Sequence, residues 1–440
     1  MKRQSLALTL AFGAIAAIAV AFVIARNSRH RSLLTSMPTV ALDQFTPTAK
    51  KFIADAMEKV EREPLRVDRW GDLGYALAGN NAPLEAARAF ARAEELDPDN
   101  YRWPHLVAVA SIKADRPAAN EALKRSLKAR PNVTATLGLL VESYLEDGLY
   151  KEADALLRPF VTEKTEDQRL LLLMARIEAE TGATDKAIAL AERSAAMPPR
   201  RREAHQLLLQ LHRRKNDAAQ VQRHARLLEL LPKAEEEPPW PDPMRAHALN
   251  YVRSVDAVAA QARGFAMQQQ PDEAIRIVNE LTPEERTAPA CAAALAMARA
   301  QRKEFAAAAE VLDSVKSPDD PNVLFAKGYI AILQEKFAEA AASFEKTAAA
   351  LSTQVGGRSV DAAHLYRGLC LSELKKDDEA IAAYEQALKI NPGNYEAILR
   401  SSELYLKKNR KADAARILAD AALLDPTDDR VKELQRRAMN

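Results

Sequence analysis

Glycine and aromatic side chains are both scarce in this sequence. Its 440 residues include only 13 glycines, and aromatic residues make up 5% of the chain. So little glycine argues against glycine-rich phosphate-binding loops and against a β fold built on many tight turns. Alanine is plentiful instead, which favours closely packed helices over sheets. Hydrophobic residues reach 48%, so there is ample material for a helical core.

Cysteine and excess charge are lacking as well. The two cysteines, Cys291 and Cys370, lie far apart in the chain, and we expect two small buried core residues rather than a disulfide. The formal net charge is +2, whereas a nucleic-acid-binding protein usually carries a strongly basic face. We therefore expect no nucleic-acid partner.

Motifs for catalysis and metal binding are also missing. The chain contains no G-x-x-x-x-G-K-[ST], G-x-G-x-x-G, G-x-S-x-G, H-E-x-x-H or C-x-x-C. His205 and His212 share one face of a predicted helix and His224 follows on the next, but the spacing lacks an i, i+4 pair and a carboxylate partner. We expect structural or surface histidines, no metal, no cofactor and no enzymatic activity.

The sequence does contain an internal repeat, which is clearest over residues 361–428. Pro392 and Pro426 lie 34 residues apart, and small and ring-bearing or leucine positions recur at the same spacing. The first copy holds Gly368, Leu371, Ala380, Tyr384, Ala387 and Pro392, and the second holds Ser402, Tyr405, Ala414, Leu418, Ala421 and Pro426. A fixed period of this size is typical of stacked helical hairpins.

The same pattern appears near the start of the chain. There the matching residues are Trp70, Leu73, Gly74, Leu77, Ala86, Phe90, Ala93 and Pro98. They resemble the tetratricopeptide repeat (TPR) pattern W-x2-L-G-x2-Y…A-x3-F…P, with Leu77 in place of the usual tyrosine. The resemblance implies an all-α fold, a right-handed superhelical α-solenoid of helix hairpins.

Repeats of this kind divide the chain into six parts. We expect a first array of about five units over residues 67–235 and a second over 255–428, separated by a proline-rich break at 236–254. We interpret residues 233–243, which contain three glutamates and four prolines, as a hinge or an exposed loop. Residues 32–66 are expected to form a spacer and an N-terminal capping helix, and residues 429–440 a C-terminal cap with a polar outer face.

The first 31 residues predict a membrane anchor. Residues 5–25 carry no charge and have basic residues on both sides. About 20 apolar residues suffice to cross a bilayer, and this run is longer than the core of a cleaved signal peptide, which is the alternative. We expect a single transmembrane helix in contact with lipid, and the repeat array on the extracytoplasmic side.

The resemblance also implies where a partner binds. In a TPR stack the first helix of each unit lines the concave side, where peptides or helices of partner proteins bind. The candidates in the second array are Phe325, Tyr329, Leu365, Leu369, Leu399 and Glu403. Those in the first array are Arg169, Arg176, Gln206, Gln210 and Arg213. For each residue the alternative is simple packing between helices.

Three functions are open at this point. The favoured one is a non-enzymatic, membrane-tethered scaffold that binds proteins, similar to bacterial envelope TPR proteins. The second is an assembly chaperone or holdase for exported polypeptides, similar to the TPR module of cytochrome c maturation. The third, an enzyme that uses the groove as its active site, lacks any nucleophile–base or metal constellation.

Overall fold

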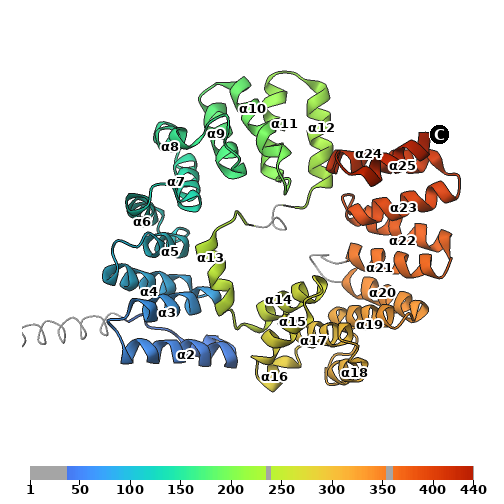
Figure 1. Cartoon of the computed structure of the whole chain (residues 1–440), viewed down its shortest axis with the longest axis horizontal. Coiled ribbons are helices and arrows are strands. Elements are labelled where there is room, and N and C mark those ends of the chain that lie inside the picture. Colours follow the sequence, from blue (N-terminus) through green and yellow to red (C-terminus); the bar gives the residue numbers. More distant parts are fainter. Residues whose placement is uncertain (1–36, 234–238, 353–359, 440) are drawn as a thin grey trace, which may run out of the picture. The chain divides into compact units, whose positions relative to one another are not determined.

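The protein is helical throughout the part that the structure describes. The computed structural model describes residues 37–233, 239–352 and 360–439, and within these ranges it contains helices and connecting turns but no β-strand (Figure 1). The all-α prediction is therefore confirmed. The predicted anchor at residues 5–25 lies outside the described residues. Among the described helices, none has both the length and the apolar character of a membrane span.

The chain folds into two compact units, and neither is continuous in sequence. Unit 1 runs up to Ser143 and also includes Pro241–Ser254. Unit 2 comprises Tyr144–Trp240 and Val255–Asn440. The boundary at residue 143 falls inside one helix.

Unit 1 is built from helical hairpins behind a capping helix. Its elements are η1 (Leu42–Gln44), α2 (Pro47–Arg62), α3 (Val67–Gly79), α4 (Pro83–Leu96), α5 (Arg102–Ser111), α6 (Arg116–Ala129) and most of α7 (Thr134–Glu146), followed after the interruption by α13 (Pro243–His247) and η4 (Ala248–Tyr251). Trp70 is completely buried on α3 and donates a hydrogen bond from Nε1 to the carbonyl of Pro64, at 2.8 Å. This bond ties the first hairpin to the turn that follows α2.

Unit 2 continues the same construction. Its first stretch holds α8 (Tyr150–Leu157), η2 (Arg158–Phe160), α9 (Gln168–Glu180), α10 (Thr184–Ala196), α11 (Arg202–Arg214) and α12 (Ala218–Leu230). Its second holds α14 (Val255–Met267), α15 (Pro271–Asn279), α16 (Pro283–Arg286), α17 (Pro289–Gln301), α18 (Phe305–Asp313), α19 (Pro321–Leu333), α20 (Phe337–Ser352), α21 (Val360–Glu373), α22 (Asp377–Ile390), α23 (Tyr395–Lys407), α24 (Lys411–Leu424) and α25 (Asp429–Met439).

Most hairpins turn through a residue in the left-handed conformation. In the described residues this residue is a glycine only at Gly148 and Gly182; elsewhere it is Asn81, Asn216, Gln269, Lys303, Glu335, Lys375 or Asn409. After Lys375, the N–H of Lys376 donates to the carbonyl of Leu371 at 2.9 Å, which closes the end of α21 in a Schellman arrangement. The hairpins can thus be closed in a sequence with little glycine, at some conformational cost.

Glycine is retained where two helices of a hairpin come closest. A Cβ atom added to Gly368 on α21 would lie 2.5 Å from the Tyr384 ring on α22, and one added to Gly328 would lie 2.9 Å from the Phe344 ring. Gly74 on α3 meets the Phe90 ring of α4 in the same way. The small and ring positions of the repeat are therefore direct packing partners.

Unit 2 also contains a contact between elements that are distant in sequence. Arg226 on α12 binds Asp420 on α24 with two guanidinium nitrogens, at 2.8 and 2.5 Å. Arg200 donates to the carbonyl of Leu423 at 2.9 Å, and Gly393 lies directly against the carbonyl of Leu230. Helix α12, the last helix in the first stretch of unit 2, is therefore joined to the C-terminal hairpin of the second stretch.

Both cysteines are free and buried in unit 2, as predicted. Burial raises the pKa of each thiol to about 11, which makes both poor nucleophiles at neutral pH.

Candidate protein-binding surfaces

The proline-rich break is not simply an exposed linker. Residues 234–238 of the hinge or exposed loop predicted at 233–243 lie outside the described residues. The rest of the break is folded: Pro241–Ser254 forms α13 and η4 and packs against α3 and α5 of unit 1 (Figure 1). We call Pro241–Ser254 the docked segment. Met244 and Val252 within it are only 7% and 6% exposed. Composition describes a segment's local preferences and not the surface that can cover it, so this docking could not be predicted from it.

One buried amide on α3's C-terminal cap holds the backbone of the docked segment. Asn80, 4% exposed, donates from Nδ2 to the carbonyl of Tyr251 and accepts at Oδ1 from the N–H of Arg253, both at 2.9 Å. Its Nδ2 also donates to the carbonyl of Ala76 at 2.8 Å, which fixes the orientation of the amide. Asn80 therefore binds a peptide through groups that every non-proline residue carries.

Aromatic stacking fixes the tyrosine of the docked segment. The ring of Tyr251 stacks on Tyr75 of α3, with centroids 5.2 Å apart, and lies 6.1 Å from the Phe52 ring of α2. Its hydroxyl donates to Asp72 at 2.7 Å. Burial and this hydrogen bond to a carboxylate raise the pKa of Tyr251, so the phenol stays protonated.

An aspartate fixes the other end of the docked segment. Asp242 caps α13 by accepting from the N–H groups of Met244 and Arg245, each at 3.1 Å. It also lies 2.9 Å from Nε2 of His105, a completely buried residue of α5 whose Nδ1 is 2.9 Å from the hydroxyl of Thr136. Burial acts to raise the pKa of Asp242, but the hydrogen bonds outweigh it and the pKa is lowered.

The residues that hold the docked segment were missed by the reasoning from sequence. Asn80, His105, Asp242 and Tyr251 were not among the predicted site residues. The available signal was a helix-capping Asp-Pro pair with a tyrosine nine residues beyond the aspartate, which is unusual in a simple linker.

The predicted apolar candidates in unit 2 lie together on α19, α21 and α23. Phe325, Leu365 and Leu369 are half-buried and pack on one core cluster. Tyr329 and Leu399 are 8% and 2% exposed, so both contribute mainly to the core. The hydroxyl of Tyr329 accepts a hydrogen bond from Gln301 at 2.7 Å.

An aromatic cluster supports this face. The Phe325 ring is 5.4 Å from Tyr366 and 5.3 Å from Phe344 in edge-to-face arrangements, and Phe344 stacks on Tyr366. Phe344 is completely buried, whereas Phe325 and Tyr366 are half-buried. We call the half-buried set Phe325, Leu365, Tyr366 and Leu369 the apolar face of unit 2.

The predicted polar candidates in unit 2 separate into two kinds. Arg169 is 7% exposed, and its guanidinium lies 5.9 Å from the Trp240 ring, which also stacks under Arg201 at 4.2 Å. Arg169 therefore faces a residue of its own chain. The remaining candidates are half-buried or exposed: Arg176, Gln206, Gln210 and Arg213.

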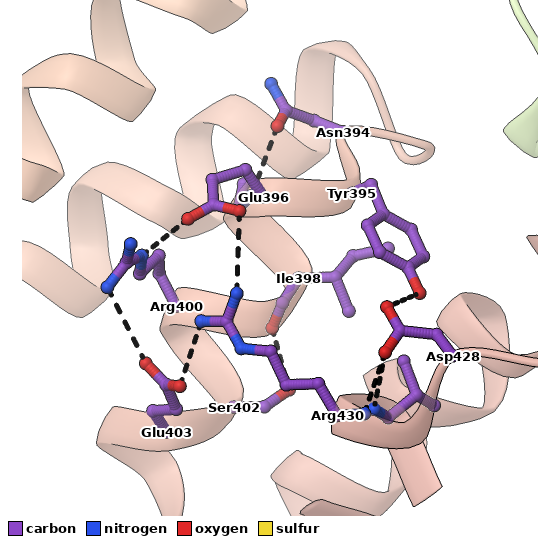
Figure 2. A network of polar contacts seen from close by, with 11 residues as sticks. Asn394, Tyr395, Glu396, Ile398, Arg400, Ser402, Glu403, Asp428 and Arg430 are labelled. Carbon is purple, nitrogen blue, oxygen red and sulfur yellow. Dashed lines mark hydrogen bonds and ion pairs between the residues drawn. The ribbon is translucent and has the colours of Figure 1, made fainter. Parts of the chain in front are cut away.

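Glu403 belongs to a charge network at the C-terminal end of unit 2. Figure 2 shows Arg400 and Arg430 between Glu396 and Glu403. The shortest contacts join Arg400 to Glu396 at 2.6 Å and Arg430 to Glu403 at 2.9 Å. Because Arg430 is on α25, the network attaches the last helix to α23, and its charges already compensate one another.

Three histidines lie together between α11 and α12. Nδ1 of His205 is 3.1 Å from Nδ1 of His224, and the rings of His212 and His224 stack at 5.6 Å. All three are at most 6% exposed. In the part of the chain that the structure describes, no group of three histidine, cysteine, aspartate or glutamate residues is arranged to hold a metal ion.

These features define a class of protein: a helical-repeat protein whose candidate sites are surfaces for other polypeptides. Comparison with known families makes this more specific. Residues 325–395 and 373–438 match two family profiles described as "Tetratricopeptide repeat". The C-terminal repeats thus carry the TPR signature, which supports that family, and TPR stacks typically act as non-enzymatic interaction scaffolds.

Solved structures with distant similarity are also helical-repeat proteins. The structure titled APC/C hetero-tetramer Cut9-Hcn1 aligns over 96% of this chain and 98% of its own, at 14% identity and a TM-score of 0.38. Yeast Tom70 aligns over 94% and 95%, at 14% and 0.36. MamA from Desulfovibrio magneticus RS-1 aligns over 44% and 99%, at 18% and 0.33. No curated protein sequence matches this chain. At such low identities and TM-scores, the alignments carry no inference about function.

Proposed function

We propose that this protein is a non-enzymatic scaffold that binds a segment of a partner protein along the first helices of its hairpins. The observation that carries the proposal is the pair of backbone hydrogen bonds made by Asn80, which donates to the carbonyl of Tyr251 and accepts from the N–H of Arg253. A side chain that binds backbone groups accepts many sequences, and neighbouring pockets then select among them.

The apolar face of unit 2 supports the same function. Phe325, Leu365 and Leu369 are half-buried on first helices, and aromatic and apolar residues are common anchors of interfaces. The charge network around Glu403 beside them is already neutralised internally. A partner segment is therefore expected to bring apolar side chains to this face.

Site-specific crosslinking tests the proposal. A photoreactive p-benzoylphenylalanine at Leu369 on α21 is compared with one at Gln386, which is exposed on the second helix of the same hairpin. We expect a discrete crosslinked protein at position 369 and none at 386, with the crosslink mapped to one segment of the partner. Equal labelling at both positions would contradict binding along the first helices. A broad mixture of unfolded exported proteins at 369 would favour the chaperone function instead.

We further propose that residues 5–25 tether the scaffold to a membrane, with the repeats on the extracytoplasmic side. The support is the uncharged run of 21 residues between basic flanks. The full chain is expected to resist carbonate extraction from membranes, and a chain lacking residues 2–26 to be released. Protease added outside the membrane should degrade the repeats; protection of the repeats would reverse the proposed orientation.

A further inference from the structure

We infer that the docked segment is an internal ligand of unit 1, and that the surface beneath it binds a partner segment of the same chemistry once the docked segment leaves. This inference rests on the proposed function and assigns a particular site to it. The surface is made by Phe52, Asp72, Tyr75, Asn80 and His105, which we call the segment-binding face.

The docked segment is attached to unit 1 mainly by polar and ring contacts, as a bound peptide is, and not by a broad buried apolar face, as a core helix is. Only Met244 and Val252 are buried, whereas Arg245, Leu249 and Asn250 are exposed. The remaining attachments are hydrogen bonds at its two ends and the contacts of His247, Tyr251 and Arg253 with the rings of Tyr75 and Phe52. Elements with few buried apolar contacts open locally at lower free energy than the core does. The docked segment can therefore leave while the hairpins of unit 1 stay folded.

The segment-binding face is shaped for a peptide backbone. A Cβ atom on Gly79 would lie 2.8 Å from the carbonyl oxygen of Ala248 and 3.2 Å from the nitrogen of Val252, so glycine allows the backbone to approach. When the docked segment leaves, the buried Asn80 amide loses a donor and an acceptor. Water can replace them singly, and another peptide backbone can restore both bonds at once.

The contacts define the chemistry of the partner segment. It requires an acidic residue to pair with His105, an apolar residue two positions later, and a tyrosine nine positions after the acid. The tyrosine must be unmodified, because a phosphate on its oxygen would stand against the carboxylate of Asp72. The chain around it must also have a free backbone N–H two residues after the tyrosine, which excludes proline there.

A labelled peptide with the sequence of residues 239–255 tests the inference by fluorescence polarisation on the full chain. In wild type the internal copy competes at an effective concentration of about millimolar, so micromolar peptide is expected to bind weakly. Met244→Ala/Tyr251→Ala weakens the internal copy alone. The apparent Kd should fall at least about tenfold, which corresponds to about 1.4 kcal/mol of weaker internal docking.

Three controls make the outcome specific. Adding Asn80→Ala to the double variant should abolish the gain, and Arg245→Ala, at an exposed position of the docked segment, should bind like wild type. A peptide with phosphotyrosine at the position of Tyr251 should not bind. Equal peptide affinity of wild type and the double variant, or a gain that survives Asn80→Ala, would overturn the inference.

A second measurement needs no destabilised variant. Excess unlabelled peptide should accelerate hydrogen exchange at residues 249–254 of the wild-type chain and leave α3 and α4 protected. Unchanged exchange at saturating peptide would show a fixed structural segment and overturn the inference. The proposed function is tested separately. If a partner is crosslinked at position 369 but the peptide does not bind unit 1, the scaffold function stands and only the inference about the docked segment is overturned.

Discussion

Acidification is expected to open the hairpin of α11 and α12. His205 and His224 are 3% and 5% exposed, with their Nδ1 atoms 3.1 Å apart. Burial, a neighbouring imidazole and the cationic Arg223 lower the pKa of both histidines from 6.5 to about 4, and Arg200 adds to the effect on His205. Both imidazoles are therefore neutral in the folded protein, and protonation acts against the fold.

The magnitude follows from the difference in pKa between the unfolded and the folded chain. Because the unfolded chain takes up the proton first, the stabilisation is present above pH 6.5 and is lost as the pH falls towards 4. Between pH 7 and pH 5 each such histidine removes about 2 kcal/mol from the free energy of opening. If the two histidines titrated independently, the pair would lose about 4 kcal/mol. Because protonated rings at this distance repel each other, the two titrations are coupled, and the loss for the pair lies between about 2 and about 4 kcal/mol.

Hydrogen exchange measures this loss where it occurs. After correction for the intrinsic rate, amides of α11 and α12 should lose about 30-fold protection or more between pH 7 and pH 5. Amides of α17 and α18, two helices that carry no histidine, serve as the internal reference. In His205→Leu/His224→Leu the pH dependence of α11 and α12 should disappear. An equal loss of protection in wild type and in this variant would refute the reasoning.

Two further predictions concern glycines. Gly368→Ala should destabilise unit 2 by about 1–3 kcal/mol in urea unfolding, because its Cβ would lie 2.5 Å from the Tyr384 ring. The control is Gly264→Ala, which is also within a helix but has no atom within 4 Å of its Cβ. It should stabilise unit 2 by about 0.5–1 kcal/mol. The same sign for both would contradict the packing argument. Gly393→Ala should speed exchange at the end of α12 and near Asp420, because its Cβ would collide with the carbonyl of Leu230. A double-mutant cycle of Arg226→Gln and Asp420→Asn should give a coupling of about 0.5–1 kcal/mol that declines with salt; no coupling at low salt would mean the pair does not join α12 to α24.

The hairpins could be predicted from the sequence because their signals are local. The predicted arrays begin at residues 67 and 255, and helices α3 and α14 begin at Val67 and Val255. The spacing from Gly368 to Tyr384 likewise anticipated a small residue meeting a ring. Such contacts span one hairpin, so a fixed period in the sequence is enough to specify them.

The site could not be predicted in the same way. Asn80 and Tyr251 are 171 residues apart, and Arg226 and Asp420 are separated by 194. The periodic pattern does not mark either pair, because each contact depends on the small rotations that accumulate between successive hairpins. The candidates Leu399 and Arg169, which are buried, show a second reason. Helical spacing in the sequence places a residue on one face of a helix, but the packing of neighbouring elements decides whether that residue is covered.

The contact between α12 and α24 gives the first stretch of unit 2 an end that comes from elsewhere in the sequence. A helical-repeat array needs a capping element where its last unit would otherwise face solvent. The chain leaves unit 2 after Trp240 and returns at Val255, yet Gly393 lies against the carbonyl of Leu230 and Asp420 pairs with Arg226. The C-terminal hairpin therefore also acts as a cap for the first stretch. A chain that stopped before α23 would lose its own last repeat and would expose the end of α12 as well.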